Sequence, residues 1–275
     1  MSESLQPPSG TPPAAAPASQ PAEPLLQIRD LARSFGGLKA VNGVSFDVIG
    51  GSITGLIGPN GAGKSTLFDL ITGVTRADRG SVRLAATELL GKPPDFIARA
   101  GLGRTFQTPR IFAAMSVWEN LMAGGNRHPG ETLSGGLFSN RRSRVREQEL
   151  AQRAGELLTF LGLERLAAGS AAELSGGQRK LLTLGRTLMM EPSILLLDEP
   201  AAGVNQTLTR TLMARITDLR ARGVTVLVVE HDMDMIMELC DHVVVMHQGE
   251  VLSQGAPSSV QHDERVIEAY LGGAV

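Results

Sequence analysis

The chain has 275 residues, enough for one large α/β domain or two small domains. Hydrophobic residues make up 42% of it and charged residues 20%, and the formal net charge of −2 argues against a nucleic-acid-binding surface. The single cysteine, Cys240, excludes an internal disulfide and favours a reducing compartment, and we expect it to be a buried apolar filler near a helix end.

Residues 1–24 predict a disordered tail. They hold seven of the 15 prolines together with many Ala and Ser, a composition that cannot bury a core. They contain no Lys or Arg and no apolar core, unlike a secretory signal. No stretch of the chain approaches the roughly 20 apolar residues that span a bilayer. Folded structure is expected from Leu25 onward.

The segment from Leu25 to Leu84 predicts short strands around one helix. Apolar runs between Gly-rich turns predict strands at Leu25–Leu31, Val41–Val48, Ser52–Gly58 and Gly80–Leu84. A helix is predicted at Lys64–Thr72, directly after a Gly-rich loop.

The apolar spacing becomes helical between about residues 89 and 188. Helices are predicted at Pro94–Ala100, Val117–Ala123, Val145–Leu161 and Gly176–Met190. Gly125–Ser143 breaks the pattern and leads into four arginines: Arg141, Arg142, Arg144 and Arg146. We favour a mobile loop before a solvated helix start; contact with anionic lipid headgroups or a membrane partner is the alternative. A second LSGG in this loop, Leu133–Gly136, lacks the following Gln and is treated as a coincidence.

The last third of the chain returns to strand character. Two apolar strands, Ile194–Leu197 and Val224–Val229, flank a helix at Gln206–Arg222 and suit a parallel sheet that is buried on both faces. A hairpin at Val243–His247 and Glu250–Gln254 and a helix at Asp263–Leu271 follow. We therefore predict one α/β domain over residues 25–255, with an inserted helical subdomain at about 89–188 and a helical extension at 256–275.

The strongest motif is the phosphate loop at Gly58–Ser65, which fits G-x-x-x-x-G-K-[ST] without deviation between a strand and a helix. Its glycines let backbone N–H groups surround phosphate oxygens at a helix N-terminus. Lys64 is expected to neutralise the β- and γ-phosphates, and the Ser65 hydroxyl to bind Mg²⁺. The nucleotide-binding residues expected here are Asn60, Gly61, Gly63, Lys64, Ser65 and Thr66.

Two acids end the apolar strand at Ile194–Leu197. We expect Asp198 to hold Mg²⁺ through water, and Glu199 to act as the general base that polarises the attacking water. His231 follows the next strand, where ligands bind in parallel sheets, and is expected to sense the γ-phosphate. Gln107 is a candidate ligand for Mg²⁺ and water because of its position in this series of motifs.

The segment LSGGQ at Leu174–Gln178 builds a second anion site at a helix N-terminus. One chain cannot easily use two such sites on one triphosphate. A head-to-tail dimer solves this, with Ser175 and Gly177 of one subunit completing the γ-phosphate site of the other. Gly176 and Gln178 complete this signature segment.

Together these motifs resemble the ATP-binding subunits of ABC transporters, over nearly everything from Leu25 onward. The resemblance implies the phosphate-loop ABC ATPase fold, with a mostly parallel core sheet, an antiparallel β subdomain and an inserted α-helical subdomain. It also implies ATP and Mg²⁺, and Phe35 stacked on adenine; packing of Phe35 within the β subdomain is the alternative. A peripheral subunit at the cytoplasmic membrane face is implied, beside permease subunits.

A closer resemblance is to the ATPases of branched-chain amino-acid importers. It rests on Phe35–Leu38 with Ala40-Val41, and on Gly103–Gln107, Asp198–Gly203 and Val266–Gly272. Most ABC ATPases carry Ser and Asp where this chain has Ala202 and Asn205, a replacement familiar in the amino-acid importer branch.

The resemblance implies an ATPase that closes as a homo- or heterodimer around two ATP molecules and drives a separate permease. The helical region near Gln107–Trp118 would relay the motion, and an extracytoplasmic binding protein would supply the cargo. One alternative is another cargo, such as lipopolysaccharide export or urea and amide uptake. The other is a soluble ABC-type ATPase that acts on nucleic acid, ribosomes or cofactor assembly.

Overall fold

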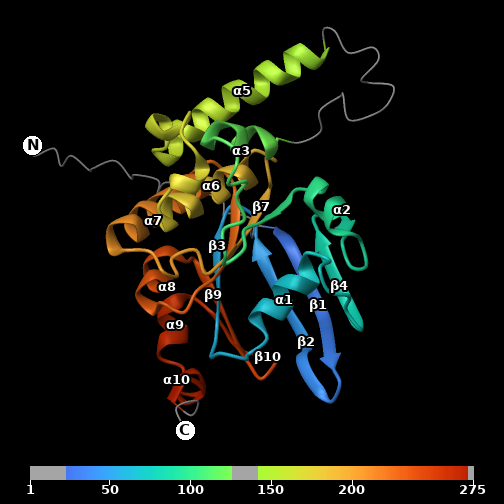
Figure 1. Ribbon diagram of the computed structural model, residues 1–275. Coiled ribbons are helices and arrows are strands. Elements are labelled where there is room, and N and C mark those ends of the chain that lie inside the picture. Colours follow the sequence, from blue (N-terminus) through green and yellow to red (C-terminus); the bar gives the residue numbers. More distant parts are fainter. Residues whose placement is uncertain (1–22, 126–141, 272–275) are drawn as a thin grey trace, which may run out of the picture.

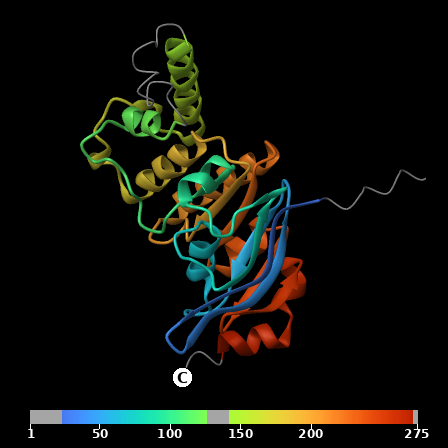
Figure 2. The ribbon, with the colours of Figure 1, turned by 90° about the vertical axis from the view of Figure 1, so that its right-hand side faces the viewer.

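The structure is a computed structural model that describes residues 23–125 and 142–271 (Figure 1). The expected N-terminal tail lies almost entirely outside these residues, as do the second LSGG and most of the Gly125–Ser143 loop. Figures 1 and 2 agree that helices α3 and α5 lie together at one end of the molecule and α10 lies at the other.

A six-stranded sheet forms the core, in the order β10-β9-β3-β8-β7-β6. Its central strands, β3 (Ile53–Ile57), β7 (Ile194–Asp198) and β8 (Thr225–Val229), pair in parallel and are buried along their whole length. Successive residues of β7 face opposite sides, so Leu195 and Leu197 join one hydrophobic cluster and Ile194 and Leu196 the other. The continuous apolar runs thus indicated a sheet that is covered on both faces, and this prediction is confirmed.

A second, antiparallel sheet has the order β2-β1-β4-β5. It consists of β1 (Pro24–Phe35), β2 (Leu38–Ile49), β4 (Arg79–Leu84) and β5 (Thr87–Glu88). The first two strands run well beyond the predicted Leu25–Leu31 and Val41–Val48. Register shifts in β1, with Asp30 at φ 46°, break the alternation on which the prediction depended. Helix α1 (Lys64–Ile71) packs its apolar face into the cluster that this sheet shares with the core sheet.

The stretch expected to be helical holds α2 (Pro94–Arg99), α3 (Val117–Ala123), α5 (Arg142–Leu161) and α6 (Gly176–Leu188). Helix α3 has the predicted bounds, because Ser116 and Glu119 form a reciprocal capping box. The same stretch also contains a strand that was not predicted, β6 (Leu102–Arg104). This strand pairs in parallel with β7 and belongs to the core sheet.

After helix α7 (Gln206–Ala221) and strand β8 comes helix α8 (Met233–Leu239), which is capped by Asp232. A helix end was expected near Cys240, but the bounds of this helix were not predicted. The hairpin of β9 (His242–His247) and β10 (Glu250–Gly255) and two short helices, α9 (Pro257–Gln261) and α10 (Glu264–Leu271), complete the described chain. Cys240 is buried at the end of α8, as expected, and burial raises the pKa of its thiol to about 12. Within residues 23–125 and 142–271, none of the helices has the length and apolar character needed to cross a membrane.

Candidate functional site

The phosphate loop joins the buried strand β3 to helix α1, and its glycines are required by their surroundings. A Cβ on Gly58 would lie 2.1 Å from the Met246 carbonyl oxygen, and one on Gly63 would lie 2.3 Å from that of Ala40. Both residues also have positive φ, 147° and 101°, so a side chain would be strained as well as blocked. The loop therefore curls tightly, with its backbone against β9 and β2.

The loop delivers unpaired donors at the start of α1. The first helical bond runs from Leu67 N to Gly63 O, so the N–H groups of Lys64, Ser65 and Thr66 have no partner within the helix. The Lys64 ammonium lies over the loop and donates to Gly58 O at 2.6 Å and to Pro59 O at 3.0 Å. This cradle of N–H groups with one lysine fits the phosphates of a nucleotide.

Acidic side chains face this lysine. Burial lowers the pKa of Lys64, while the negative charges of Glu199 and Asp198 act in the opposite direction. The three groups are therefore close enough to interact electrostatically, although Lys64 and Glu199 are 135 positions apart (199 − 64). The carboxyl end of β7 and the phosphate loop form one site.

The two acids at the end of β7 differ in setting. Asp198 is buried, and its Oδ2 accepts a hydrogen bond from Arg104 Nη2 at 3.0 Å. Glu199 is half-buried and has φ 45°, a conformation that non-glycine residues rarely adopt and that marks functional positions. This turn directs the Glu199 side chain away from the strand, toward Gln107.

Gln107 and Glu199 meet across the site. Gln107 Nε2 donates to Glu199 Oε2 at 2.5 Å, although the residues are 92 positions apart. His231 is exposed, and its Nδ1 lies 3.8 Å from Oε2 of the buried Glu230. The structure thus brings Gln107, Asp198 and Glu199 together with Lys64 and leaves the His231 ring open to solvent.

Three charged residues that contact the site were not predicted from the sequence. Arg104 contacts Asp198, as described above. Lys180 Nζ of α6 donates to Glu199 O at 3.0 Å and to Ala202 O at 2.6 Å, and burial lowers its pKa. Glu230 accepts from Ala201 N at 2.8 Å, and burial raises its pKa. The local signal in each case was a charged residue within three positions of a predicted site residue (Gln107, Gln178 or His231), while these contacts span 19 to 94 positions.

The signature segment is a well-capped helix start. Ser175 Oγ accepts from Gln178 N at 3.3 Å, while Gln178 Oε1 accepts from Ser175 N at 2.9 Å. Ser175 and Gly176 are exposed, but Gly177 is buried, and a Cβ there would lie 1.7 Å from Leu208 Cδ2. Gly177 thus allows α6 to pack closely against α7, and Gln178 is engaged within its own chain.

Two further predicted positions have clear settings. The Phe35 side chain is 46% exposed at the end of β1, so it does not pack into the core of the β subdomain. Arg33 lies over the same ring, 4.8 Å from its centroid. Asn205 caps α7 by accepting from Leu208 N at 3.0 Å.

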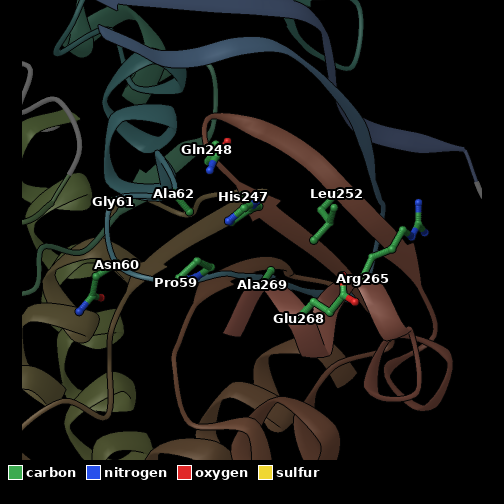
Figure 3. Close-up of a pocket in the computed structure, with 10 residues that line it drawn as sticks. All are labelled: Pro59, Asn60, Gly61, Ala62, His247, Gln248, Leu252, Arg265, Glu268 and Ala269. Atoms are coloured by element: carbon green, nitrogen blue, oxygen red, sulfur yellow. The ribbon is translucent and has the colours of Figure 1, made fainter. Parts of the chain in front are cut away.

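A cavity of about 610 Å³ adjoins the phosphate loop on the side of α10. Figure 3 shows the loop residues on one side of it and Arg265 and Glu268 on the other. Next to it, the buried Tyr270 hydroxyl faces the Gly58 backbone; burial raises the pKa of this phenol, and the Gly58 N–H acts against that rise. The C-terminal helix therefore lies directly against the phosphate loop.

Comparison with known proteins agrees with this geometry. Residues 41–202 match the family model of the ABC transporter, and residues 250–275 match that of the branched-chain amino acid ATP-binding cassette transporter. The chain is 42% identical to the high-affinity branched-chain amino acid transport ATP-binding protein BraF of Pseudomonas aeruginosa, over 91% of this chain and 99% of the relative. It is 39% identical to LivG of Escherichia coli, which carries the same description, over 92% and 99% of the two chains.

Solved structures show the same fold. A nucleotide-free ATP-binding cassette from an ABC transporter superposes with a TM-score of 0.78 at 38% identity, covering 90% of this chain and 99% of that one. An ATP-binding cassette in its ADP conformation gives a TM-score of 0.78 at 36% identity, covering 91% and 100%. The predicted fold class and the resemblance are confirmed: the chain belongs to the ABC transporter ATP-binding family and is an ATPase that couples ATP hydrolysis to transport.

Proposed function

We propose that this chain energises an importer of branched-chain amino acids, as a peripheral subunit at the cytoplasmic face of the membrane. The cargo is supported by the descriptions of BraF and LivG and by the match of residues 250–275 to the model of that transporter class. Its partners are a second ABC ATPase subunit, which is a copy of this chain or a relative, and membrane permease subunits. An extracytoplasmic binding protein acts indirectly.

In the proposed nucleotide site, Phe35 stacks on adenine and the phosphate loop holds the phosphates. The loop contributes Asn60, Gly61, Gly63, Lys64, Ser65 and Thr66. Lys64 neutralises the β- and γ-phosphates, which its position over the loop and beside the acids supports.

Glu199 is the proposed general base, and Gln107 orients the attacking water with it. Ser65, Gln107 and Asp198 are proposed to hold Mg²⁺, which prefers oxygen ligands and keeps several waters when it binds nucleotides. When bound, Mg²⁺ neutralises charge that develops on the phosphates. The exposed Ser65 hydroxyl and the carboxylate of Asp198 are oxygen donors of the required kind.

The signature segment acts on the partner's nucleotide. Ser175, Gly176, Gly177 and Gln178 of one subunit complete the γ-phosphate site of the other, and His231 senses that phosphate from within its own subunit. Exposure of Ser175, Gly176 and His231 supports this assignment, because these groups have room to meet a second molecule. Hydrolysis then removes the contacts that hold the pair closed.

One observation carries the proposed site of ATP hydrolysis: the hydrogen bond of 2.5 Å between Gln107 Nε2 and Glu199 Oε2. The amide of Gln107, three residues after β6, thus meets the carboxylate of Glu199, one residue after β7, and the charge of Glu199 acts on Lys64. This pairing supports the assignment of Glu199 as the base and of Gln107 as the group that orients the attacking water beside the γ-phosphate.

Replacement of the base tests this assignment. Glu199→Gln should bind ATP, accumulate as a stable dimer and lose steady-state hydrolysis by about 100-fold or more, since general bases contribute on that order. The control is Glu191→Gln, another glutamate with positive φ, 54°, which pairs with Arg153 beyond the opposite end of β7. Normal hydrolysis by Glu199→Gln would remove the base from its assigned role.

The cargo needs a separate experiment. The chain is co-purified with its permease and binding protein, and the thermal stability of the binding protein is screened against an amino-acid panel. Stabilisation by Leu, Ile or Val supports the proposed cargo, while stabilisation only by urea, an amide or another solute assigns a different one. A purely soluble partner in the pull-down would overturn the proposed import role.

A further inference from the structure

Arg104 occupies a nearly buried position between two elements of the nucleotide site. Its side chain is 8% exposed at the end of β6. Nη1 donates to Asp69 Oδ1 at 2.6 Å and to Thr72 Oγ1 at 3.1 Å, near the end of α1. Nη2 donates to Asp198 Oδ2 at 3.0 Å, at the end of β7. One guanidinium thus joins the helix that follows the phosphate loop to the strand that carries the acids.

The arrangement has an electrostatic reason. Asp69 and Asp198 are two carboxylates in a partly desolvated space, with side chains 35% and 11% exposed, and the guanidinium lies between them. Only arginine offers two terminal nitrogens on one rigid plane, so a single side chain can fix both carboxylates. Its Nε has no partner, so the side chain is placed to serve the two acids rather than to satisfy all of its own donors.

The same guanidinium contacts the segment that carries Gln107. It lies 5.0 Å from the ring centroid of Phe106, the residue directly before Gln107, and 5.5 Å from that of Phe68 in α1. Contacts of this kind orient an arginine through the ring quadrupole. Arg104 therefore touches all three parts of the proposed metal site: the helix of the phosphate loop, the strand of Asp198 and the segment of Gln107.

We propose that Arg104 is a positioning residue for Mg²⁺ in this site. It holds one oxygen of Asp198 in a fixed orientation, which leaves the other oxygen for a metal-bound water, and it ties that orientation to α1 and to the Gln107 segment. This inference rests on the proposed role of Asp198. Groups that orient metal ligands from behind typically change metal affinity by about 10- to 100-fold when they are replaced.

The test compares nucleotide affinity with and without Mg²⁺. Binding of a non-hydrolysable ATP analogue by the full chain is measured in excess Mg²⁺ and in excess EDTA, and the ratio gives the Mg²⁺-dependent gain. Arg104→Gln should lower this gain by about tenfold or more and leave the affinity in EDTA within about twofold. Arg104→Lys, which keeps the charge but loses the fork, should recover part of the gain.

The controls separate a positioning role of Arg104 from a role in folding, and they test the proposed role of Asp198 on its own. Arg153→Gln removes another arginine that joins two elements, through Glu191 and the Leu188 carbonyl, and should leave the gain unchanged. Asp198→Asn should lose the gain. If it does and Arg104→Gln keeps the gain, the positioning role is overturned; if Asp198→Asn keeps it, the proposed metal ligand is wrong.

Further variants cover the case in which Arg104→Gln does not fold. Asp69→Asn frees one side of the guanidinium. Like Arg104→Lys, it should give a Mg²⁺-dependent gain that is smaller than that of the wild type. Equal loss of affinity in EDTA and in Mg²⁺ by these variants would assign Arg104 to the fold alone. In Arg104→Lys the metal surroundings should lose their single arrangement. The spectrum of bound Mn²⁺, used as a paramagnetic probe, should therefore broaden.

Discussion

The phosphate loop and the signature segment both present glycines and a hydroxyl at the start of a helix, yet their surroundings differ. Lys64 interacts with the charges of Asp198 and Glu199, and its pKa is shifted by burial. Ser175 and Gly176 are exposed, and Ser175 forms its hydrogen bonds with Gln178 in the first turn of its own helix. The phosphate loop therefore has a cation and two carboxylates in its own chain, whereas the signature segment is proposed to act on the nucleotide of a second molecule.

The comparison predicts opposite outcomes for two glycine substitutions, and this is the largest effect expected. Gly63→Ala places a Cβ 2.3 Å from Ala40 O at φ 101°, so it should cost more than about 2 kcal/mol of stability and abolish nucleotide binding. Gly176→Ala meets nothing within 4 Å and should fold with normal nucleotide affinity. Thermal unfolding and nucleotide titration of the two purified chains measure the difference.

In dimers, Gly176→Ala should lower the rate of hydrolysis if the residue faces the partner's nucleotide as proposed. Equal affinity and equal turnover in Gly176→Ala and the wild type would contradict the assignment in trans.

Mixing two inactive variants tests directly whether Lys64 and Ser175 act on one nucleotide from two different chains. Lys64→Ala lacks the lysine and Ser175→Ala lacks the signature hydroxyl, so each chain alone should form dimers without an intact composite site. A mixed dimer regains one site, built from Lys64 of one copy and Ser175 of the other, and should recover part of the wild-type hydrolysis rate. No recovery in a mixture that still dimerises on ATP would place both groups on one nucleotide within one chain.

Much of the fold around the two helix starts could be predicted from the sequence, because it depends on local patterns. The strand, Gly-rich loop and helix around Lys64, the capping residues of α3 and the buried run before Asp198 each encode their structure within about ten residues. Strand β6 escaped because three residues, Leu-Gly-Arg, carry no periodicity. Contacts made by tertiary structure also escaped, such as that of Arg104 with Asp198 across 94 positions.

The signature segment has a packing role that the sequence did not reveal. Gly177→Ala drives a Cβ into Leu208 of α7, so it should cost about 1–3 kcal/mol through overpacking. Leu208→Ala in the same chain should recover stability relative to the single variants, because it removes the atoms in contact. Denaturant unfolding of the two single variants and the double variant measures this coupling.

Rescued stability without rescued hydrolysis would confirm that Gly177 serves the fold and the partner's site separately. Additive losses in the double variant would show that the close approach to Leu208 does not limit this position.

The smallest effect on stability is expected at Glu230, a buried carboxyl whose charge interacts with that of Glu199. Burial raises the pKa of this carboxyl above its ordinary 4.5, so the folded chain binds the proton more tightly than the unfolded chain. Stability from this group is therefore full below about pH 4.5 and falls as the pH rises from there through the folded-state pKa, after which the penalty is constant. Glu230→Gln removes the penalty, but its amide can accept from only one of the two backbone donors, Ala201 N at 2.8 Å or His231 N at 3.3 Å.

The amide should keep the shorter bond, so we expect a net change below about 1 kcal/mol near neutral pH. The stability of Glu230→Gln relative to the wild type should rise between pH 4.5 and neutrality, as measured by denaturant unfolding at stepped pH. A relative stability that falls over this range would mean that the fold stabilises the carboxylate of Glu230, because its backbone donors outweigh the cost of burial. In that case this buried charge beside the phosphate-loop site would add to the stability of the fold and not subtract from it.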